Sequence, residues 1–254
     1  MGARLGQHFL FDPAILGRIA DAALLTSQDT VLEVGPGRGT LTRELLARAG
    51  RVFAIETDRR LAEALKREAP QSLSVIHGDA LKVPWPRADV IAGNIPYQIT
   101  SPLIERALTA PRPRRIVFLV QQEVAARLAA EPGGSDYGAL SAGVQLVATV
   151  ERLFGVRRGA FRPAPRVDSA LVRITPRDVP LVGSEEEEAA VRRLIRALFQ
   201  RRRQQIRRSL REGLGLGAQA VGTLLERTGI APTARAEQLA VEELVALARL
   251  TQLA

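Results

Sequence analysis

The stretch TVLEVGPGRGTLTRELLAR, residues 30 to 48, decides the fold class. It joins an apolar, β-branched run to a helix-like segment through a turn with three glycines. Four further apolar runs follow along the chain, at residues 51–56, 73–78, 88–94 and 115–121. Apolar runs separated in this way by helix-like segments are typical of buried parallel strands with crossover helices. We therefore predict an α/β domain with a doubly wound, Rossmann-like, mostly parallel sheet.

Two later β-like runs, residues 150–158 and 169–175, are expected to form an antiparallel edge of that sheet. The pattern changes after Pro180. From Ser184 to the end it is helical, and four glutamates behind Ser184 favour a helix start. The sequence thus predicts a catalytic domain over residues 1–180 and a small all-helical domain over residues 181–254.

Composition excludes several kinds of site. The 254 residues contain no Cys and only two His, far apart, so disulfides, thiolate nucleophiles and zinc or iron–sulfur sites are not expected. We expect no metal. No uncharged apolar stretch reaches the length of a spanning helix and no secretory signal is visible, so we expect a cytoplasmic protein without a membrane partner.

The spacing of the glycine turn indicates its ligand. A dinucleotide fingerprint that starts at Gly35 and Gly37 needs a third glycine at position 40, but that residue is Thr and the third glycine is Gly39. With Glu33 two residues before the first glycine, the turn is closer to one that binds S-adenosylmethionine. We expect backbone contacts to that donor here.

Two acids follow the next two strands. Glu56 ends the second predicted strand, where a carboxylate can accept both hydroxyls of a ribose. Asp79 ends the third, where it can accept from an adenine amine. Each acid alone could equally be a helix N-cap or a surface charge. Their shared position at strand ends favours nucleoside binding.

The segment Asn94, Ile95, Pro96, Tyr97 follows the fourth strand at the same sheet edge. An exocyclic adenine amine is a poor nucleophile, because its lone pair is delocalised into the ring. The Asn94 side-chain oxygen and a main-chain carbonyl held by Pro96 can accept its two hydrogens, while Tyr97 stacks on the flipped base. Positioning then supplies the rate without a strong base. The alternative is a turn stabilised by Asn and Pro.

Motifs along the whole chain resemble the rRNA adenine N6,N6-dimethyltransferase family of the KsgA type. They are GQHFL (6–10), EVGPGRG (33–39), NIPYQITSPL (94–103), VQQEVAARL (120–128), YGALS (137–141), FRPAPRVDSALVRI (161–174), LFQRRRQQIRRSL (198–210) and PTARAEQL (232–239). The resemblance implies a class I methyltransferase domain plus a small helical domain. It also implies S-adenosylmethionine-dependent transfer of four methyls to two adjacent adenines near the 3′ end of 16S rRNA, in the small ribosomal subunit or its precursor, with a role in subunit biogenesis. We expect a monomer.

On this resemblance the site residues are assigned as follows. The donor is expected to contact Gln7, His8, Leu10, Glu33, Gly35, Gly37, Gly39, Glu56, Asp79, Ala80 and Asn94. Asn94, Ile95, Pro96, Tyr97 and Phe161 are expected to form the catalytic site. The family commonly has Asn where His8 stands, and we expect His8 to bond the donor's carboxylate or to be a structural residue. Phe161 is either the second aromatic face against the target base or a core residue.

The excess of positive charge is confined to one segment of the chain. The formal net charge is +9, and residues 192–211 hold nine Arg and no acid. Apolar residues at helical spacing predict a cationic helical ridge that binds RNA phosphates through Arg201, Arg202, Arg203, Arg207 and Arg208. A solvated helix face and an acidic membrane surface are the alternatives for this ridge. For the function of the whole chain there are two alternatives: a 23S rRNA adenine methyltransferase of the macrolide-resistance type, and a non-catalytic assembly factor.

Overall fold

A computed structural model describes residues 7–200 and 204–251 of the chain. The chain divides into two compact units, the first made of Met1–Ala125 and Val150–Pro176, the second of Ala126–Thr149 and Arg177–Ala254. The second unit thus begins again at Arg177, three residues before the predicted boundary after residue 180, and it also includes Ala126–Thr149, which the sequence had placed in the first domain. That segment belongs to the second unit because its helix packs against a later one and the Gly133 N–H donates to the Glu237 carbonyl.

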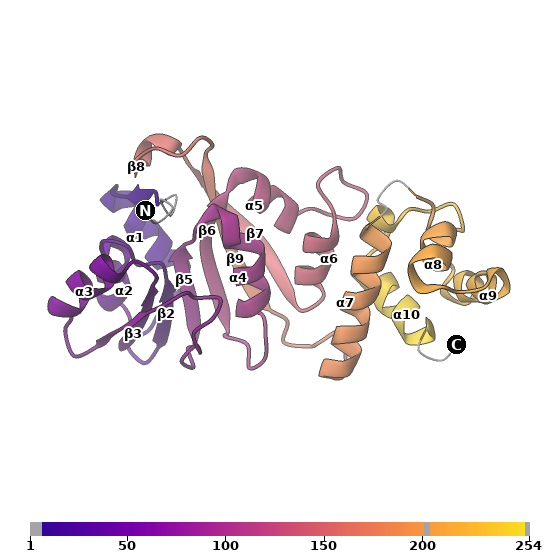
Figure 1. Ribbon diagram of the computed structural model, residues 1–254, viewed down its shortest axis with the longest axis horizontal. Helices are drawn as coiled ribbons and strands as arrows, with labels where there is room; N and C mark the ends of the chain where they lie inside the picture. Colours follow the sequence, from indigo (N-terminus) through magenta and orange to yellow (C-terminus); the bar gives the residue numbers. More distant parts are fainter. Residues whose placement is uncertain (1–6, 201–203, 252–254) are drawn as a thin grey trace. The chain divides into compact units, whose positions relative to one another are not determined.

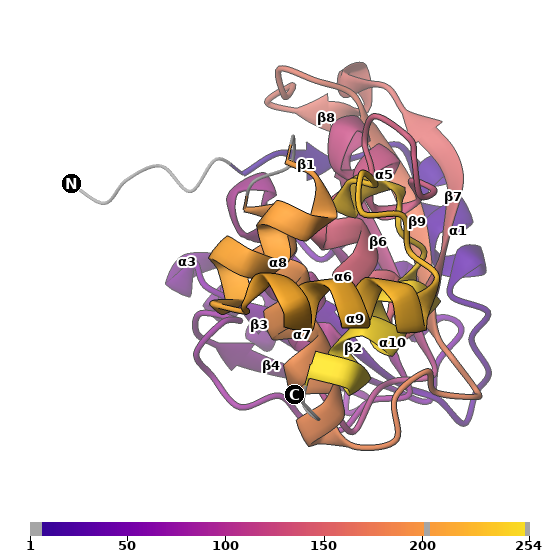
Figure 2. The ribbon, with the colours of Figure 1, turned by 90° about the vertical axis from the view of Figure 1, so that its right-hand side faces the viewer.

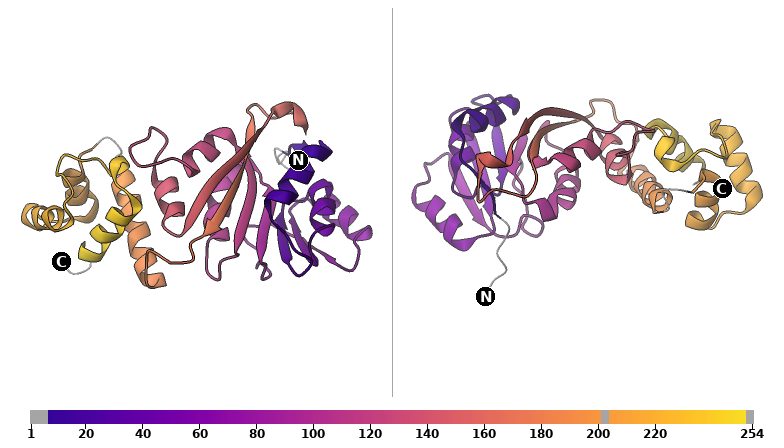
Figure 3. Two further views of the ribbon diagram at one scale, coloured as in Figure 1. Left: turned by 180° about the vertical axis from the view of Figure 1, so that it is seen from behind. Right: turned by 90° about the horizontal axis from the view of Figure 1, so that it is seen from above.

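The first unit is built on a seven-stranded sheet in the order β4-β3-β2-β5-β6-β9-β7, which Figure 1 shows from one side and Figure 3 from behind. The neighbours from β4 to β6 pair in parallel, and β9 pairs antiparallel with β6. The strands are β2 (Thr30–Val34), β3 (Arg51–Glu56), β4 (Leu73–His77), β5 (Val90–Asn94), β6 (Arg115–Gln121), β7 (Ala148–Val156) and β9 (Ser169–Pro176). The predicted mostly parallel sheet with an antiparallel edge is confirmed.

One helix precedes β2, and further helices follow β2, β3, β5 and β6. They are α1 (Pro13–Ala22), α2 (Thr40–Leu46), α3 (Arg59–Arg67), α4 (Thr100–Ala107) and α5 (Gln122–Leu128). The side chains of Asp12 and Asp58 cap α1 and α3 by accepting N–H groups of the first turn. Because β2, β5 and β6 lie in the middle of the sheet, their residues are almost all buried. Parallel pairing within the sheet holds the carboxyl ends of β2, β3, β4 and β5 at the same edge.

A two-stranded sheet outside the main one was not expected from the sequence. β1 (Phe9–Leu10) pairs antiparallel with β8 (Phe161–Arg162), so that Leu10 faces Phe161 in the register. The two strands are 152 residues apart from Phe9 to Phe161, and each has only two residues, too few to give a periodic signal. This pairing brings the N-terminal segment to the segment after β7.

The second unit is helical in its described part. It contains α6 (Ala139–Gln145), α7 (Glu185–Phe199), α8 (Ile206–Leu214), α9 (Ala218–Thr228) and α10 (Val241–Thr251), the last four of which Figure 2 shows. The Ser184 side chain accepts the Glu187 N–H, which confirms the predicted start of α7. No helix in the described ranges is long and apolar enough to cross a bilayer.

Candidate active site

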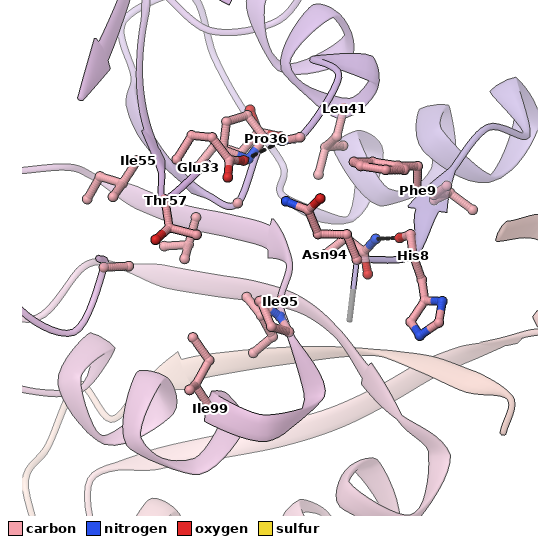
Figure 4. A pocket seen from close by; sticks show the side chains of 18 of the residues that line it. His8, Phe9, Glu33, Pro36, Leu41, Ile55, Thr57, Asn94, Ile95 and Ile99 are labelled. Atoms are coloured by element: carbon pink, nitrogen blue, oxygen red, sulfur yellow. Dashed lines mark hydrogen bonds between the residues drawn. The ribbon is translucent and has the colours of Figure 1, made fainter. Parts of the chain in front are cut away.

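A cavity of about 230 Å³ lies in the first unit, at the carboxyl ends of the central strands (Figure 4). Ten of the eleven residues expected to contact the donor line it. They are Gln7, His8, Leu10, Glu33, Gly35, Gly37, Glu56, Asp79, Ala80 and Asn94. Ile95, Pro96 and Tyr97 line the same cavity. Segments separated by almost 90 residues thus meet at one edge of the sheet. The strand ends predicted this for Glu56, Asp79 and Asn94, and the family resemblance implied it for the N-terminal segment.

The glycine turn that follows β2 lines one side of the cavity. Gly35 and Gly37 have φ angles of 72° and 57°, a region that L side chains rarely adopt. A Cβ on Gly37 would lie 2.9 Å from Cε1 of Phe9. The ring of Phe9 can therefore pack against this turn only because residue 37 has no side chain. The Gly37 N–H donates to Glu56 at 2.9 Å, which ties the turn to the end of β3.

Glu33 lies at the bottom of the site and is 1% exposed. Burial raises the pKa of its carboxyl to about 8, and the nearby charge of Glu56 adds to the rise. The Thr42 hydroxyl, which donates to Glu33 at 2.6 Å, opposes the rise in pKa. Glu33 is therefore mostly protonated at neutral pH in the free protein, which limits charge repulsion between two buried acids.

The Glu56 carboxylate is fixed by two backbone hydrogen bonds. Burial raises its pKa, while N–H groups of Asp58 and Gly37 stabilise the carboxylate and lower it. Each oxygen accepts one backbone N–H, at 2.8 Å from Asp58 and 2.9 Å from Gly37. A carboxylate has about four acceptor positions, so two remain for hydroxyl groups in the cavity.

Asp79 follows β4 on the same side. One oxygen accepts the Leu81 N–H at 2.9 Å, and the other lies 3.7 Å from the Lys82 ammonium. Its side chain is 40% exposed, so the carboxylate borders both the cavity and the surface. It can accept from an amine within the cavity through its remaining acceptor positions.

Asn94 has a defined orientation. Its Nδ2 donates to the main-chain carbonyl of His8 at 2.9 Å, as the dashed line in Figure 4 shows. Because a carbonyl can only accept, the amide nitrogen must face His8 and Oδ1 must face the other way. The acceptor of Asn94 is thereby free for a donor group of a ligand.

Tyr97 has one partner for its hydroxyl and one for the face of its ring. Its hydroxyl and that of Ser169 on β9 are 2.8 Å apart, and burial raises the pKa of the phenol. The imidazole of His8 stacks on it, with ring centroids 5.8 Å apart and an interplanar angle of 29°. Nδ1 of His8 lies 2.8 Å from the Pro163 carbonyl oxygen. The His8 ring therefore contacts Tyr97 and the Pro163 carbonyl in the free protein. The expected bond from His8 to the donor's carboxylate stays a prediction.

Two predicted site residues lie elsewhere. Gly39 is outside the cavity lining, with φ of 73° directly before α2, and a Cβ there would meet Leu65 at 2.7 Å. Its glycine is needed for the turn and for helix packing. Phe161 is 2% exposed and belongs to the hydrophobic core. Its place in the core agrees with one of the two alternatives for Phe161, and its role as an aromatic face against the target base stays a prediction.

Other lining residues had no assigned role in the sequence. They are Phe9, Leu16, Val34, Pro36, Thr40, Leu41, Ile55, Thr57, Gly78, Gln98 and Ile99. Thr40 follows the glycine turn, and its hydroxyl donates to the Leu10 carbonyl at 3.1 Å, which fixes the N-terminal segment beside the turn. Its position next to the glycines was the available signal. Phe9 had none, because its place over Gly37 depends on the pairing of β1 with β8.

The arginine segment spans the end of α7 and the start of α8 instead of one continuous helix. Leu194, Ile195, Leu198 and Ile206 are buried, which confirms the predicted apolar face. Arg207 and Arg208 are exposed on α8, and Arg208 pairs with Glu212 at 2.7 Å. Arg201, Arg202 and Arg203 lie outside the described residues.

The strand order and the glycine-turn cavity at the sheet edge define a class I methyltransferase. The sequence model of the family "Ribosomal RNA adenine dimethylase" matches residues 2–252. A ribosomal RNA small subunit methyltransferase A from Desulfitobacterium hafniense is 41% identical over 96% of this chain and 89% of that protein. The chain therefore belongs to the ribosomal RNA adenine dimethylase family, whose chemistry uses S-adenosylmethionine as methyl donor.

Solved structures agree. A dimethyladenosine transferase from Plasmodium falciparum has a TM-score of 0.85 and 30% identity, covering 94% of this chain and 96% of that one. The 23S rRNA methyltransferase ErmE has a TM-score of 0.75 and 30% identity, covering 96% and 99%. Among the described residues, no cluster of His, Cys, Asp and Glu has the arrangement of a metal site.

Proposed function

We propose that this protein dimethylates N6 of two adjacent adenosines near the 3′ end of 16S rRNA, in the small ribosomal subunit or its precursor, with a role in subunit biogenesis. The printed name of the relative from Desulfitobacterium hafniense supports the small subunit as substrate. The match to ErmE supports the alternative, a 23S rRNA substrate, but at 30% identity against 41% for the small-subunit relative.

The observation that carries the proposal is the orientation of Asn94. With Nδ2 held by the His8 carbonyl, Oδ1 can accept a hydrogen from an exocyclic adenine amine. A second acceptor is the carbonyl of the Ile95–Pro96 segment. Two acceptors on one amine draw the nitrogen toward tetrahedral geometry, so that its lone pair is localised on the nitrogen instead of delocalised into the ring and the nitrogen becomes nucleophilic. Tyr97, fixed by Ser169, offers a ring on which the flipped base stacks.

The cavity residues fit S-adenosylmethionine. Glu56 keeps two acceptor positions for ribose hydroxyls, and Gly35 and Gly37 leave the turn without side chains, so that a ligand can approach the backbone. Asp79 supplies an acceptor for the adenine amine of the donor. When bound, this donor supplies a sulfonium methyl group as the electrophile. The protein's own contribution is to bind, orient and exclude water.

RNA binding is assigned to the arginine segment of the second unit. Arg207 and Arg208 are exposed at the start of α8. Together with Arg201, Arg202 and Arg203, they give a local positive charge that suits phosphates and carries no base readout.

Methylation of purified 30S and 50S particles from an unmodified strain tests the proposal. We expect four methyl groups per 30S particle, mapped to two adjacent adenosines near the 3′ end, and none on 50S particles. Label confined to 50S particles would show the ErmE-like alternative instead. Absence of label on both, with binding to 30S particles retained, would show a non-catalytic assembly factor.

A further inference from the structure

A second cavity, of about 740 Å³, lies in the first unit at the amino-terminal edge of the sheet. Its walls come from the start of β2, the connection between β4 and β5, the end of α4 and the loop from α4 to β6. β5 has five residues, so this edge is roughly 13 Å from Asn94 at the other end of the strand. The methyl-transfer site therefore does not explain this amino-edge cavity.

The lining of the amino-edge cavity is positively charged. It contains three arginines, Arg87, Arg106 and Arg112, and one acid, Asp89. Asp89 has a partner in the fold, because one carboxylate oxygen accepts the Thr30 N–H at 2.8 Å. Arg87 is exposed, whereas Arg112 is fixed at Nε, which donates to the Leu108 carbonyl at 2.8 Å. The excess of guanidinium groups favours an anionic ligand, with phosphate or carboxylate groups.

The same cavity is lined by the single tryptophan of the chain, Trp85. Its indole is half-buried, and Nε1 donates to the Ala80 carbonyl at 2.8 Å, which fixes the ring. The Arg106 guanidinium lies 5.0 Å from the ring centroid, and its Nη2 donates to the Val83 carbonyl at 2.5 Å. Bases of single-stranded RNA stack on aromatic rings and on guanidinium planes. A flat base therefore has an oriented partner at this corner of the cavity.

Prolines complete the walls. Pro86 comes from the connection between β4 and β5, and Pro111 and Pro113 come from the loop between α4 and β6. A proline has a restricted backbone and no N–H, so these walls are stiff and offer apolar contact without hydrogen-bond donors. An inorganic anion or an acidic peptide would use the arginines of this cavity but not its indole. A nucleotide uses both.

We propose that the amino-edge cavity binds an unpaired nucleotide of the RNA substrate, with its phosphate at Arg87 and Arg112 and its base at Trp85 and Arg106. This inference rests on the proposed RNA substrate. The bound nucleotide differs from the target adenosine, because the amino-edge cavity and Asn94 lie at opposite edges of the sheet. It gives the catalytic unit an RNA contact of its own, in addition to the arginine segment of the second unit.

Trp85 itself provides the measurement, because the chain has no other tryptophan. A base that stacks in the cavity quenches its fluorescence. The full-length protein, without methyl donor, is titrated with single-stranded hexa-uridylate RNA, with uridine monophosphate, with inorganic phosphate and with a hexa-aspartate peptide. Hexa-uridylate contains no adenine, so that it is not a substrate for the proposed methyl transfer.

The variants remove charge from the cavity and keep its ring. Trp85 is not replaced, because its bond to the Ala80 carbonyl supports the donor cavity. Arg87→Gln and the double variant Arg87→Gln with Arg112→Gln are compared with the wild type. The control is Arg59→Gln with Arg60→Gln, which removes the same charge from an exposed pair on α3.

We expect hexa-uridylate to quench Trp85 by about a fifth or more and to reach saturation, because stacking on a ring is sequence-tolerant. The double variant of Arg87 and Arg112 should need about fivefold more RNA for half of the quench, and Arg87→Gln alone about twofold more. KM for 30S particles should rise by the same factors, with kcat and the donor Kd unchanged, since neither arginine touches the reacting atoms. The α3 control should match the wild type.

Free uridine monophosphate should quench only at a concentration about tenfold higher or more, because it has one phosphate instead of several. Inorganic phosphate and hexa-aspartate should not quench at all, because they carry no base. A hexa-aspartate effect equal to that of RNA would assign the cavity to an acidic peptide and overturn the inference. Equal midpoints for uridine monophosphate and hexa-uridylate would overturn it in favour of a free nucleotide.

Two further results would also overturn the inference. One is unchanged Trp85 fluorescence throughout the hexa-uridylate titration. The other is a wild-type midpoint in the double variant of Arg87 and Arg112, which would place the phosphate contact elsewhere. The fluorescence titration needs no methyl transfer, so its failure leaves the proposed function untouched. A wild type that transfers no methyl to 30S particles would instead refute the proposed function.

Discussion

The proposed donor cavity and the arginine segment differ in their physical character. In the cavity, Glu33 and Glu56 are buried and tied to Thr42 and the glycine turn by hydrogen bonds. In the described arginine segment, Arg207 and Arg208 are exposed and make few fixed contacts. Buried, oriented polar groups give large effects when one atom is lost, whereas exposed charges add up in small, salt-dependent steps. Substitutions in the two regions should therefore differ in size and in salt dependence.

The largest effect is expected at the reacting nitrogen. Asn94→Ala and Tyr97→Ala should each lower kcat at least 100-fold, because each removes a contact that strengthens as the amine attacks the methyl. RNA affinity should stay nearly unchanged, since the arginine segment is intact. Single-turnover methyl transfer to 30S particles measures the rate, and filter binding measures affinity.

Tyr97→Phe is the matched control for the ring. It loses only the hydroxyl that bonds Ser169, so its rate should fall much less than that of Tyr97→Ala. Wild-type activity in Asn94→Ala would refute the role of its amide as acceptor.

The proposed donor contact of Glu56, at the end of β3, should give the next largest effect. Glu56→Gln turns one acceptor into an amide NH2 that must face the N–H of Gly37 or Asp58. We expect the Kd of S-adenosylmethionine to rise roughly 10- to 100-fold, as for the loss of hydrogen bonds to a charged group. Calorimetry measures this, with Glu63→Gln, exposed on α3, as control. A donor Kd equal to that of the wild type would remove Glu56 from the site.

Glu33 should give the fold a characteristic pH dependence. Its pKa is about 8 in the folded protein and near 4.5 when unfolded, so the unfolded state loses the proton first as pH rises. The contribution of Glu33 to the free energy of unfolding is therefore fully present below about pH 4.5, decreases between pH 4.5 and 8, and does not change further above pH 8. The slope is about 1.4 kcal/mol per pH unit, or tenfold in the unfolding constant.

Glu33→Gln should remove this slope, because the amide oxygen can still accept from Thr42 but does not titrate. Urea unfolding at pH 5.5, 6.5 and 7.5 compares the variant with the wild type, and Glu105→Gln on the exposed face of α4 serves as the control. Parallel pH curves for Glu33→Gln and the wild type would show that Glu33 is ionised in the folded state.

The sequence predicted what depends on local pattern. The β-like runs predicted each of the seven main strands to within two residues. The signal is strongest in β2, β5 and β6, because burial on both faces makes a strand continuously apolar, whereas β7 is largely exposed. Ser184 gave the start of α7 through its capping side chain. The strand-end positions of Glu33, Glu56 and Asn94 placed them in one cavity, since parallel strands align their carboxyl ends.

What the sequence did not predict depends on contacts between distant segments. The pairing of β1 with β8 sets the places of Phe9 and Phe161, and no pattern in two-residue strands signals it. The stacking of His8 on Tyr97 follows from that pairing and from the Pro163 carbonyl. The assignment of Ala126–Thr149 to the second unit has the same origin, because α6 buries its face on α7, which is nearly 40 residues further along the chain.

The smallest effect is expected at the start of α8. Replacing Arg207 and Arg208 together by Gln should weaken binding to 30S particles about three- to tenfold and lower the magnitude of the salt slope by one to two. Donor affinity should not change. The chain contains a matched control, because Arg59 and Arg60 on α3 are also adjacent and exposed, and Arg59 pairs with Glu63 at 2.7 Å as Arg208 pairs with Glu212. The control pair removes the same charge from the catalytic unit. If both double variants flatten the salt slope equally, the phosphate contact is spread over the molecule; if only the α8 pair does, it belongs to the arginine segment.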